Sequence, residues 1–198
     1  MPAPSPILPD RSRRDWTAEQ LHALPDDGNR YEVVDGELLV TPAPSWRHQG
    51  AVGELYVLLR EYAHRHALHC MIAPAEVPFS RTTVVEPDVF VTPRRADGAP
   101  PREFSDVRRL VLAVEVLSPT SLRADRHVKR RLYQREGVEE YWIVDTEHRV
   151  IERWCPGTEI PDVLAESLAW SPMPDEEPLV IDLVAYFRRV HGEETAAN

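Results

Sequence analysis

The chain has 198 residues, of which 42% are hydrophobic and 28% are charged, and it carries a formal net charge of -10 at pH 7. This composition is typical of an ordinary soluble globular protein. No stretch approaches the roughly 18 uncharged apolar residues of a membrane span, and the first residues lack the apolar core of a signal peptide. Cys70 and Cys155 have neither disulfide-framework nor metal-site spacing, which predicts reduced thiols in a cytoplasmic protein.

The negative charge is unevenly distributed along the sequence. Residues 90–136 hold 11 Lys and Arg against 6 Asp and Glu, whereas residues 137–198 hold 4 against 14. The acidic total argues against a general nucleic-acid binder, but a local basic face can still attract phosphate. The simpler interpretation of the basic segment is a solvated arginine-rich surface, and charge counting alone favours it.

The N-terminal third combines a proline-rich segment, a hairpin and a long helix. Residues 1–15 are expected to be disordered. Thr17–Gln20 has capping-box spacing and opens a short helix that extends to about residue 24. Asp35-Gly36, between the short apolar runs 31–34 and 37–41, predicts a tight β-hairpin. The spacing of apolar residues then predicts a long amphipathic helix over residues 46–66.

Strands and helices alternate in the rest of the chain. Apolar runs bounded by turn residues predict strands over residues 70–79, 84–91, 109–117, 141–144 and 150–154. A helix over residues 122–136 is expected to end at Gly137, a typical C-cap, and a closing helix is expected over residues 179–190. We expect a polar loop over residues 92–108 and a frayed tail over residues 191–198, and residues 156–178 show no clear pattern.

This order of elements predicts an α/β protein with a mixed central sheet flanked by helices and an N-terminal β-hairpin. Residues 16–190 are expected to form a single domain, in which the helix after the third core strand makes a right-handed crossover. Trp46, Trp142 and Trp154 are expected to be packing residues.

Two carboxylates stand inside the predicted core strands. Glu115 lies within the apolar run Leu110–Ser121, and Asp88 lies within Val84–Val91. A buried ionised carboxylate needs a basic partner, a proton or a metal, because its desolvation costs on the order of several kcal/mol. On neighbouring strands, Asp88, Glu115 and the backbone carbonyl of Val116 would supply the oxygen ligands that Mg²⁺ or Mn²⁺ prefers.

The helix after Glu115 carries further candidates. Asp125, Lys129 and Tyr133 are spaced at i, i+4 and i+8 and therefore share one face of the helix. Lys129 could hold a nucleophilic water or a phosphate there. The alternative is an ordinary surface ion pair between Asp125 and Lys129, with Tyr133 as a half-buried core ring. Candidates for contacts with a phosphate backbone are Arg123, Arg126, Arg130 and Arg131.

Five segments together resemble the Uma-two family, a bacterial family of proposed restriction endonucleases within the PD-(D/E)xK nuclease fold. They follow one another between about Trp16 and Trp154, and they are Tyr31–Glu37 (YEVVDGE), Glu86–Val91 (EPDVFV), Val114–Ser121 (VEVLSPTS), Asp125-x-x-x-Lys129-x-x-x-Tyr133 and Gly137–Asp145 (GVEEYWIVD). The resemblance implies a restriction-endonuclease-like core of a helix, three strands, a helix and a strand.

The resemblance also implies a metal-dependent active site. Pro87-Asp88 matches the PD of the family, and Glu115 matches its second acid. The wider fold places a lysine two residues beyond that acid, but this position holds Leu117 here. Lys129 matches a lysine that the family carries on the next helix.

Two further residues have a functional and an ordinary interpretation. Glu37 is a candidate third metal ligand, or an exposed acid of the hairpin. His48 is a candidate phosphate contact or proton carrier, or a capping or surface histidine.

These features predict an endonuclease that hydrolyses DNA phosphodiester bonds with a carboxylate-bound Mg²⁺ or Mn²⁺ and an assisting lysine. The alternative is a nuclease-fold protein that binds nucleic acid or a protein partner without cleavage, which the displaced lysine and the acidic charge keep open. Metal-free hydrolysis by a carboxylate pair, as in glycosidases, is disfavoured because the expected aromatic platform for a sugar is missing. A homodimer is expected by analogy with endonucleases that cut both strands.

Overall fold

The computed structural model describes residues 9–95, 97–107 and 109–193. Its helices are α1 (Ala18–Leu21), α2 (Trp46–Arg65), the 3-10 turn η1 (Phe104–Asp106), the π-helical turn η2 (Ala124–Lys129), α3 (Arg130–Arg135) and α4 (Leu183–Val190). Its strands are β1 (Arg30–Val34), β2 (Glu37–Thr41), β3 (Leu68–Ile72), β4 (Val77–Ser80), β5 (Thr83–Val85), β6 (Val89–Pro93), β7 (Leu112–Val116), β8 (Glu140–Asp145), β9 (Val150–Trp154), β10 (Asp162–Leu164), β11 (Ser167–Trp170) and β12 (Leu179–Asp182).

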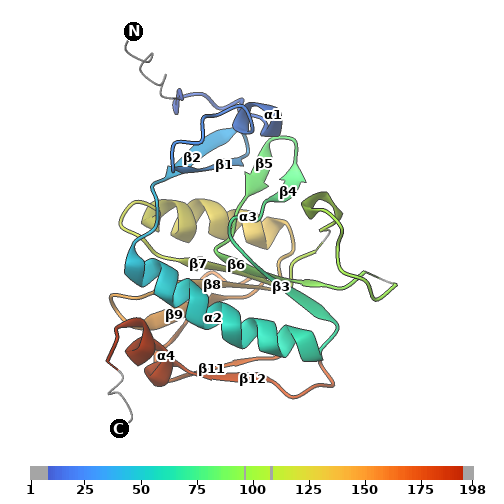
Figure 1. Ribbon diagram of the computed structural model, residues 1–198, viewed down its shortest axis with the longest axis vertical. Helices are drawn as coiled ribbons and strands as arrows, with labels where there is room; N and C mark the ends of the chain where they lie inside the picture. The colour runs from blue at the N-terminus through green and yellow to red at the C-terminus, as the bar shows by residue number, and fades with distance from the viewer. Residues whose placement is uncertain (1–8, 96, 108, 194–198) are drawn as a thin grey trace.

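A six-stranded mixed sheet with the order β10-β9-β8-β7-β6-β3 forms the centre of the molecule (Figure 1). β7 and β8 are parallel, and the segment η2–α3 connects them, whereas the other neighbours are antiparallel. α2 and α4 pack on one face of this sheet, and α3 packs on the other. The expected α/β architecture, with a mixed sheet between helices, is confirmed.

A smaller four-stranded sheet with the order β2-β1-β5-β4 covers the α3 side of the molecule (Figure 1). The β1–β2 hairpin turns at Asp35 and Gly36, whose φ angles of 51° and 80° explain the Asp-Gly sequence. A Cβ atom at Gly36 would lie 2.3 Å from the Arg14 carbonyl oxygen, so this position accepts only glycine. The expected N-terminal hairpin is therefore part of a second sheet that contacts the core.

Two expected strands are each divided between the two sheets. The run 70–79 forms β3 in the central sheet and β4 in the smaller one, and the run 84–91 forms β5 in the smaller sheet and β6 in the central one. The predictions of single strands are wrong because an apolar run does not show where the chain changes sheets. Asp88 consequently lies in the link before β6 and not within a strand.

The remaining differences concern local elements. The expected helix over 122–136 begins as the π-helical turn η2, and the expected helix over 179–190 begins as β12, which pairs with β11. Trp142 and Trp154 are buried as expected, but Trp46 is 95% exposed at the start of α2. An apolar residue in the first turn of a helix has no neighbour to cover it unless another element reaches that end.

The ends of the chain are described in part. From residue 9 onwards the expected disordered segment contains a turn in which the Trp16 indole donates to the Asp10 carbonyl at 3.0 Å. Residues 1–8 and 194–198 lie outside the described residues, so the expectations for them stay predictions. Within the described residues, no helix is long and apolar enough to cross a membrane.

Candidate active site

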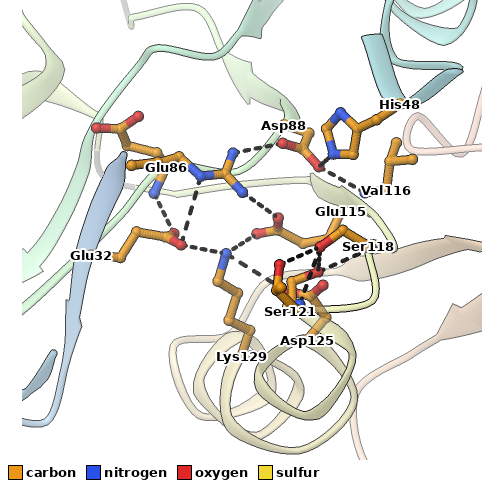
Figure 2. A network of polar contacts seen from close by, with 12 residues as sticks. Glu32, His48, Glu86, Asp88, Glu115, Val116, Ser118, Ser121, Asp125 and Lys129 are labelled. Atoms are coloured by element: carbon orange, nitrogen blue, oxygen red, sulfur yellow. Dashed lines mark hydrogen bonds and ion pairs between the residues drawn. The ribbon is translucent and has the colours of Figure 1, made fainter. Parts of the chain in front are cut away.

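A cluster of buried charges lies where the two sheets and the helical crossover meet (Figure 2). β7 provides Glu115, the link before β6 provides Asp88, and the last residue of η2 is Lys129. β1 of the smaller sheet contributes Arg30 and Glu32. These five residues come from four separate segments, so the folded chain is required to bring them together.

Glu115 is 1% exposed and points, like Ala113, to the α3 side of the central sheet. Its Oε1 atom accepts a hydrogen bond from Lys129 Nζ at 2.9 Å and another from the Tyr133 hydroxyl at 3.0 Å. Burial raises the pKa of Glu115 well above its usual value, and Lys129 only partly offsets this effect. Glu115 is therefore an acid whose charge depends on the cations around it.

Asp88 is 2% exposed and is held from three sides. Arg30 Nη1 donates to Oδ1 at 2.6 Å, and the backbone N–H of Val116 donates to Oδ2 at 2.8 Å. His48 Nε2 lies 3.2 Å from Oδ2. Burial opposes ionisation, but His48, Arg30 and the Val116 amide outweigh it and hold the pKa of Asp88 well below its usual range. The surroundings of Asp88 thus favour its charged form.

Lys129 is buried in full, and its ammonium lies between carboxylates (Figure 2). Nζ lies 2.8 Å from Glu32 Oε2, 2.9 Å from Glu115 Oε1 and 3.8 Å from Asp125 Oδ1. Burial lowers the pKa of Lys129, but the carboxylates outweigh burial and raise it overall. The helix-surface alternative is wrong for this lysine, because its charge points into the core.

Asp125 shares the buried face of η2 with Lys129. Burial raises the pKa of Asp125 to about 6, although the Lys129 ammonium favours its charged form. Its position in a π-helical turn is notable because such turns occur frequently at functional sites. Of the two residues expected as accessory, Tyr133 contacts Glu115, and Asp125 lies beside Lys129.

Two members of the cluster, Arg30 and Glu32, were not predicted from the sequence. Glu32 is 1% exposed and also accepts a hydrogen bond from the backbone N–H of Glu86 at 2.8 Å. The third carboxylate beside Lys129 is therefore Glu32. Glu37, the candidate third ligand, lies outside this cluster on β2, with Oε1 3.7 Å from Arg14. Glu32 stands within the family-like segment Tyr31–Glu37, and this was the signal that could have identified it. Arg30 precedes that segment, and the sequence does not show which side of this strand is buried.

The predicted phosphate-contact arginines are not equivalent. Arg126 donates to Glu152 and Asp145, and the Arg130 guanidinium lies over the Trp154 ring at 4.7 Å. Arg123 and Arg131 are exposed. Two of the four are therefore engaged in protein contacts, and the other two point towards solvent.

An open cleft leads from the surface to Asp88, and its lining includes Arg30, His48 and Ser118. Glu86, two residues before Asp88, also lines this cleft. Burial and the neighbouring Glu32 raise the pKa of Glu86 to about 7. A ligand in the cleft would therefore meet two carboxylates, Asp88 with a lowered pKa and Glu86 with a raised one.

The donor chemistry of the site fits a hard divalent cation, because Asp88 and Glu115 supply oxygen atoms that face a shared cation, Arg30. Among residues 9–95, 97–107 and 109–193, no group of three or more His, Cys, Asp or Glu side chains has an arrangement that could hold a metal ion. The predicted site has two such side chains and one backbone oxygen, so the role of Asp88, Glu115 and the Val116 carbonyl as ligands of Mg²⁺ or Mn²⁺ stays a prediction.

Comparisons with known proteins identify a matching family and a solved structure with a similar fold. A family model named Uma2 and described as "Putative restriction endonuclease" matches residues 18–182. The fold is similar to the crystal structure of a "putative nuclease belonging to DUF820" from Anabaena variabilis, with a TM-score of 0.70, 17% sequence identity, and coverage of 88% of this chain and 99% of that chain. A search of curated proteins finds no match.

Proposed function

Because the chain belongs to the Uma2 family and places Asp88 in an open cleft, with Glu115 and Lys129 in the same buried cluster of charges, we propose that it is a metal-dependent endonuclease that hydrolyses DNA phosphodiester bonds. The observation that carries this proposal is the contact of Lys129 Nζ with Glu115 Oε1 at 2.9 Å. The usual lysine position on the strand, two residues after the second acid, holds Leu117. Lys129 on the crossover helix places a lysine beside that acid instead.

The proposed roles follow from the positions of the side chains. Asp88 and Glu115, with the Val116 carbonyl, would hold Mg²⁺ or Mn²⁺. Such an ion lowers the pKa of a bound water and neutralises charge on a phosphate. Lys129 would orient the attacking water or the phosphate, and Glu115 and Glu32 fix its ammonium for that task. His48, at the cleft, would contact phosphate or carry a proton.

A second function, binding of nucleic acid without cleavage, is favoured by one observation. Every carboxylate oxygen of Asp88 and Glu115 already faces a donor or a cation of the protein. A site whose charges are balanced internally can persist as structure without a metal. The acidic net charge of -10 also makes binding of a phosphate backbone less favourable.

Cleavage assays distinguish the two functions. Plasmid DNA, single-stranded DNA and RNA would be incubated with Mg²⁺, Mn²⁺ or EDTA, with wild-type protein and Asp88→Asn. Asp162→Asn is the matched control, since Asp162 pairs with Arg153 away from the cleft. We expect cleavage that requires the ion, disappears in Asp88→Asn and persists in the control. Binding without cleavage by the wild type in every ion would favour the non-catalytic function.

Oligomeric state belongs to the same proposal. A homodimer would place two sites on opposite strands of a duplex, and light scattering coupled to size-exclusion chromatography measures it directly. A monomer that only nicks plasmid DNA would contradict the dimer.

A further inference from the structure

The guanidinium of Arg30 lies between the carboxylates of Asp88 and Glu115. Asp88 Oδ2 is taken by the Val116 amide and His48, and Glu115 Oε1 is taken by Lys129 and Tyr133. The two oxygens that remain, Asp88 Oδ1 and Glu115 Oε2, face the two terminal nitrogens of Arg30 at 2.6 Å and 3.8 Å. The guanidinium therefore stands between the only oxygens that the acids could offer to another cation without losing their other bonds.

A divalent ion and this guanidinium cannot share that position. An ion bound by both acids would lie about 2.1 Å from an oxygen of each, which is the space that Arg30 fills now. The two cations also satisfy the same negative charge, so the presence of one weakens the attraction of the other. Arg30 is in this sense a competitor of any metal at the site.

The side chain of Arg30 has few contacts that would prevent it from moving away from Asp88 and Glu115. Its only hydrogen bond among the described residues goes to Asp88, and its Nε atom, 3.9 Å from Glu32, has no hydrogen-bond partner there. Its side chain is 18% exposed and lines the open cleft, whereas Lys129 is 2% exposed. Of the two cations in the cluster, Arg30 alone has a path to the cleft.

We propose that Arg30 holds the cation position between Asp88 and Glu115 in the metal-free protein, yields it to a divalent ion, and then binds a phosphate of the nucleic acid in the cleft. This inference rests on the proposed function. A guanidinium is charged at every physiological pH, and its planar donors match phosphate oxygens in pairs. Once the ion neutralises both acids, Arg30 keeps Glu32, 3.9 Å from its Nε atom, and its terminal nitrogens become available to a phosphate in the cleft.

The first arm of the test measures the metal alone. Mn²⁺ would be titrated calorimetrically into the full-length wild type, Arg30→Gln and Arg30→Lys. Glutamine keeps a donor for Asp88 but removes the charge, so we expect Mn²⁺ to bind about tenfold more tightly or better. Lysine keeps the charge and should change the affinity less. Arg153→Gln, which removes an equal charge outside the cleft, should stay within about twofold of wild type.

The second arm measures nucleic acid. With Ca²⁺ present, the affinity for a fluorescent oligonucleotide duplex and for its single strand would be read by anisotropy. Arg30→Gln should weaken binding about fivefold or more, although it binds the ion more tightly. Circular dichroism and the melting temperature would verify folding of each variant, and Arg30→Lys provides a second folded variant that keeps the charge.

The outcomes separate this inference from the proposed function. Tighter Mn²⁺ binding together with weaker DNA binding in Arg30→Gln supports the exchange of partners. Unchanged or weaker Mn²⁺ binding by this variant, with normal binding by the wild type, overturns the inference and leaves the nuclease proposal intact. No Mn²⁺ binding by either protein overturns the metal-dependent function itself.

Discussion

Replacing Lys129 with methionine removes the charge at the centre of the cluster while keeping a long side chain. Glu32 and Glu115 are each 1% exposed and lie 2.8 Å and 2.9 Å from the Lys129 ammonium. Removal of one partner of a buried ion pair costs about 3–5 kcal/mol, because the other partner is left uncompensated. We therefore expect Lys129→Met to lower the free energy of unfolding by about that amount at pH 8, out of a typical total of about 5–15 kcal/mol.

The loss should depend on pH in a defined direction. The pKa of Glu115 is raised by burial, and without Lys129 it rises further, as does the pKa of Asp125 from about 6. At pH values between the unfolded-state and folded-state pKa of these acids, the native state binds more protons than the unfolded state. The free energy of unfolding of the variant therefore falls as the pH rises. The difference from wild type should therefore be smaller at pH 5.5 than at pH 8.

Urea unfolding followed by circular dichroism and tryptophan fluorescence at both pH values measures this effect. Arg81→Met is the matched control, because Arg81 pairs with Glu19 on the surface and such a pair contributes roughly 0–1 kcal/mol. Adding Glu32→Gln to Lys129→Met should restore part of the loss. A loss below about 1 kcal/mol, or one equal at both pH values, would refute the reasoning that Lys129 neutralises buried acids.

Three further predictions concern individual groups. The pKa of Glu86 is raised to about 7, so its charge destabilises the native state as the pH rises through that value. Glu86→Gln should therefore raise the melting temperature at pH 8 and not at pH 5. An equal rise at both pH values would contradict this. Burial raises the pKa of the Cys70 thiol to about 12, so we expect it to react with a disulfide reagent only on unfolding, as followed by absorbance during urea titration. Leu55 is 0% exposed on the buried face of α2, and Leu55→Ala should cost about 2–5 kcal/mol in urea unfolding. Val57→Ala, at an exposed position of the same helix, should stay within about 0.5 kcal/mol.

The fold was predictable where a pattern has a single explanation. Asp35-Gly36 between two apolar runs is a strong hairpin signal, and the short apolar run around Glu115, bounded by Ser118 and Pro119, is typical of a buried strand. The division of the runs 70–79 and 84–91 between two sheets was not predictable, because both halves of each run are apolar and the change of partner leaves no mark on periodicity. The sequence does not distinguish β12 from the start of a helix, because three apolar residues followed by Asp182 fit either period.

The site was predictable only as far as its apolar surroundings revealed it. Asp88, Glu115 and Lys129 were found because acids inside apolar runs, or a lysine in a family motif, are unusual. Arg30 and Glu32 stand in a short strand that alternates in polarity, where charged residues normally face water. Their burial arises from the docking of the smaller sheet onto the crossover helix, which is a property of tertiary structure.

The distribution of the site over two sheets also affects how the chain assembles. Arg30 and Glu32 belong to one sheet, whereas Glu115 belongs to the other and Lys129 to the crossover helix that lies between. A partly folded chain with the central sheet formed and the N-terminal sheet detached would leave Asp88 without its guanidinium and Lys129 without one of its carboxylates. In such an intermediate, the charges of Asp88 and Lys129 would lie among apolar side chains without these partners. The two sheets should therefore become ordered in one cooperative step. A fragment that begins after β2 would then fail as a stable core, even though it keeps every strand of the central sheet.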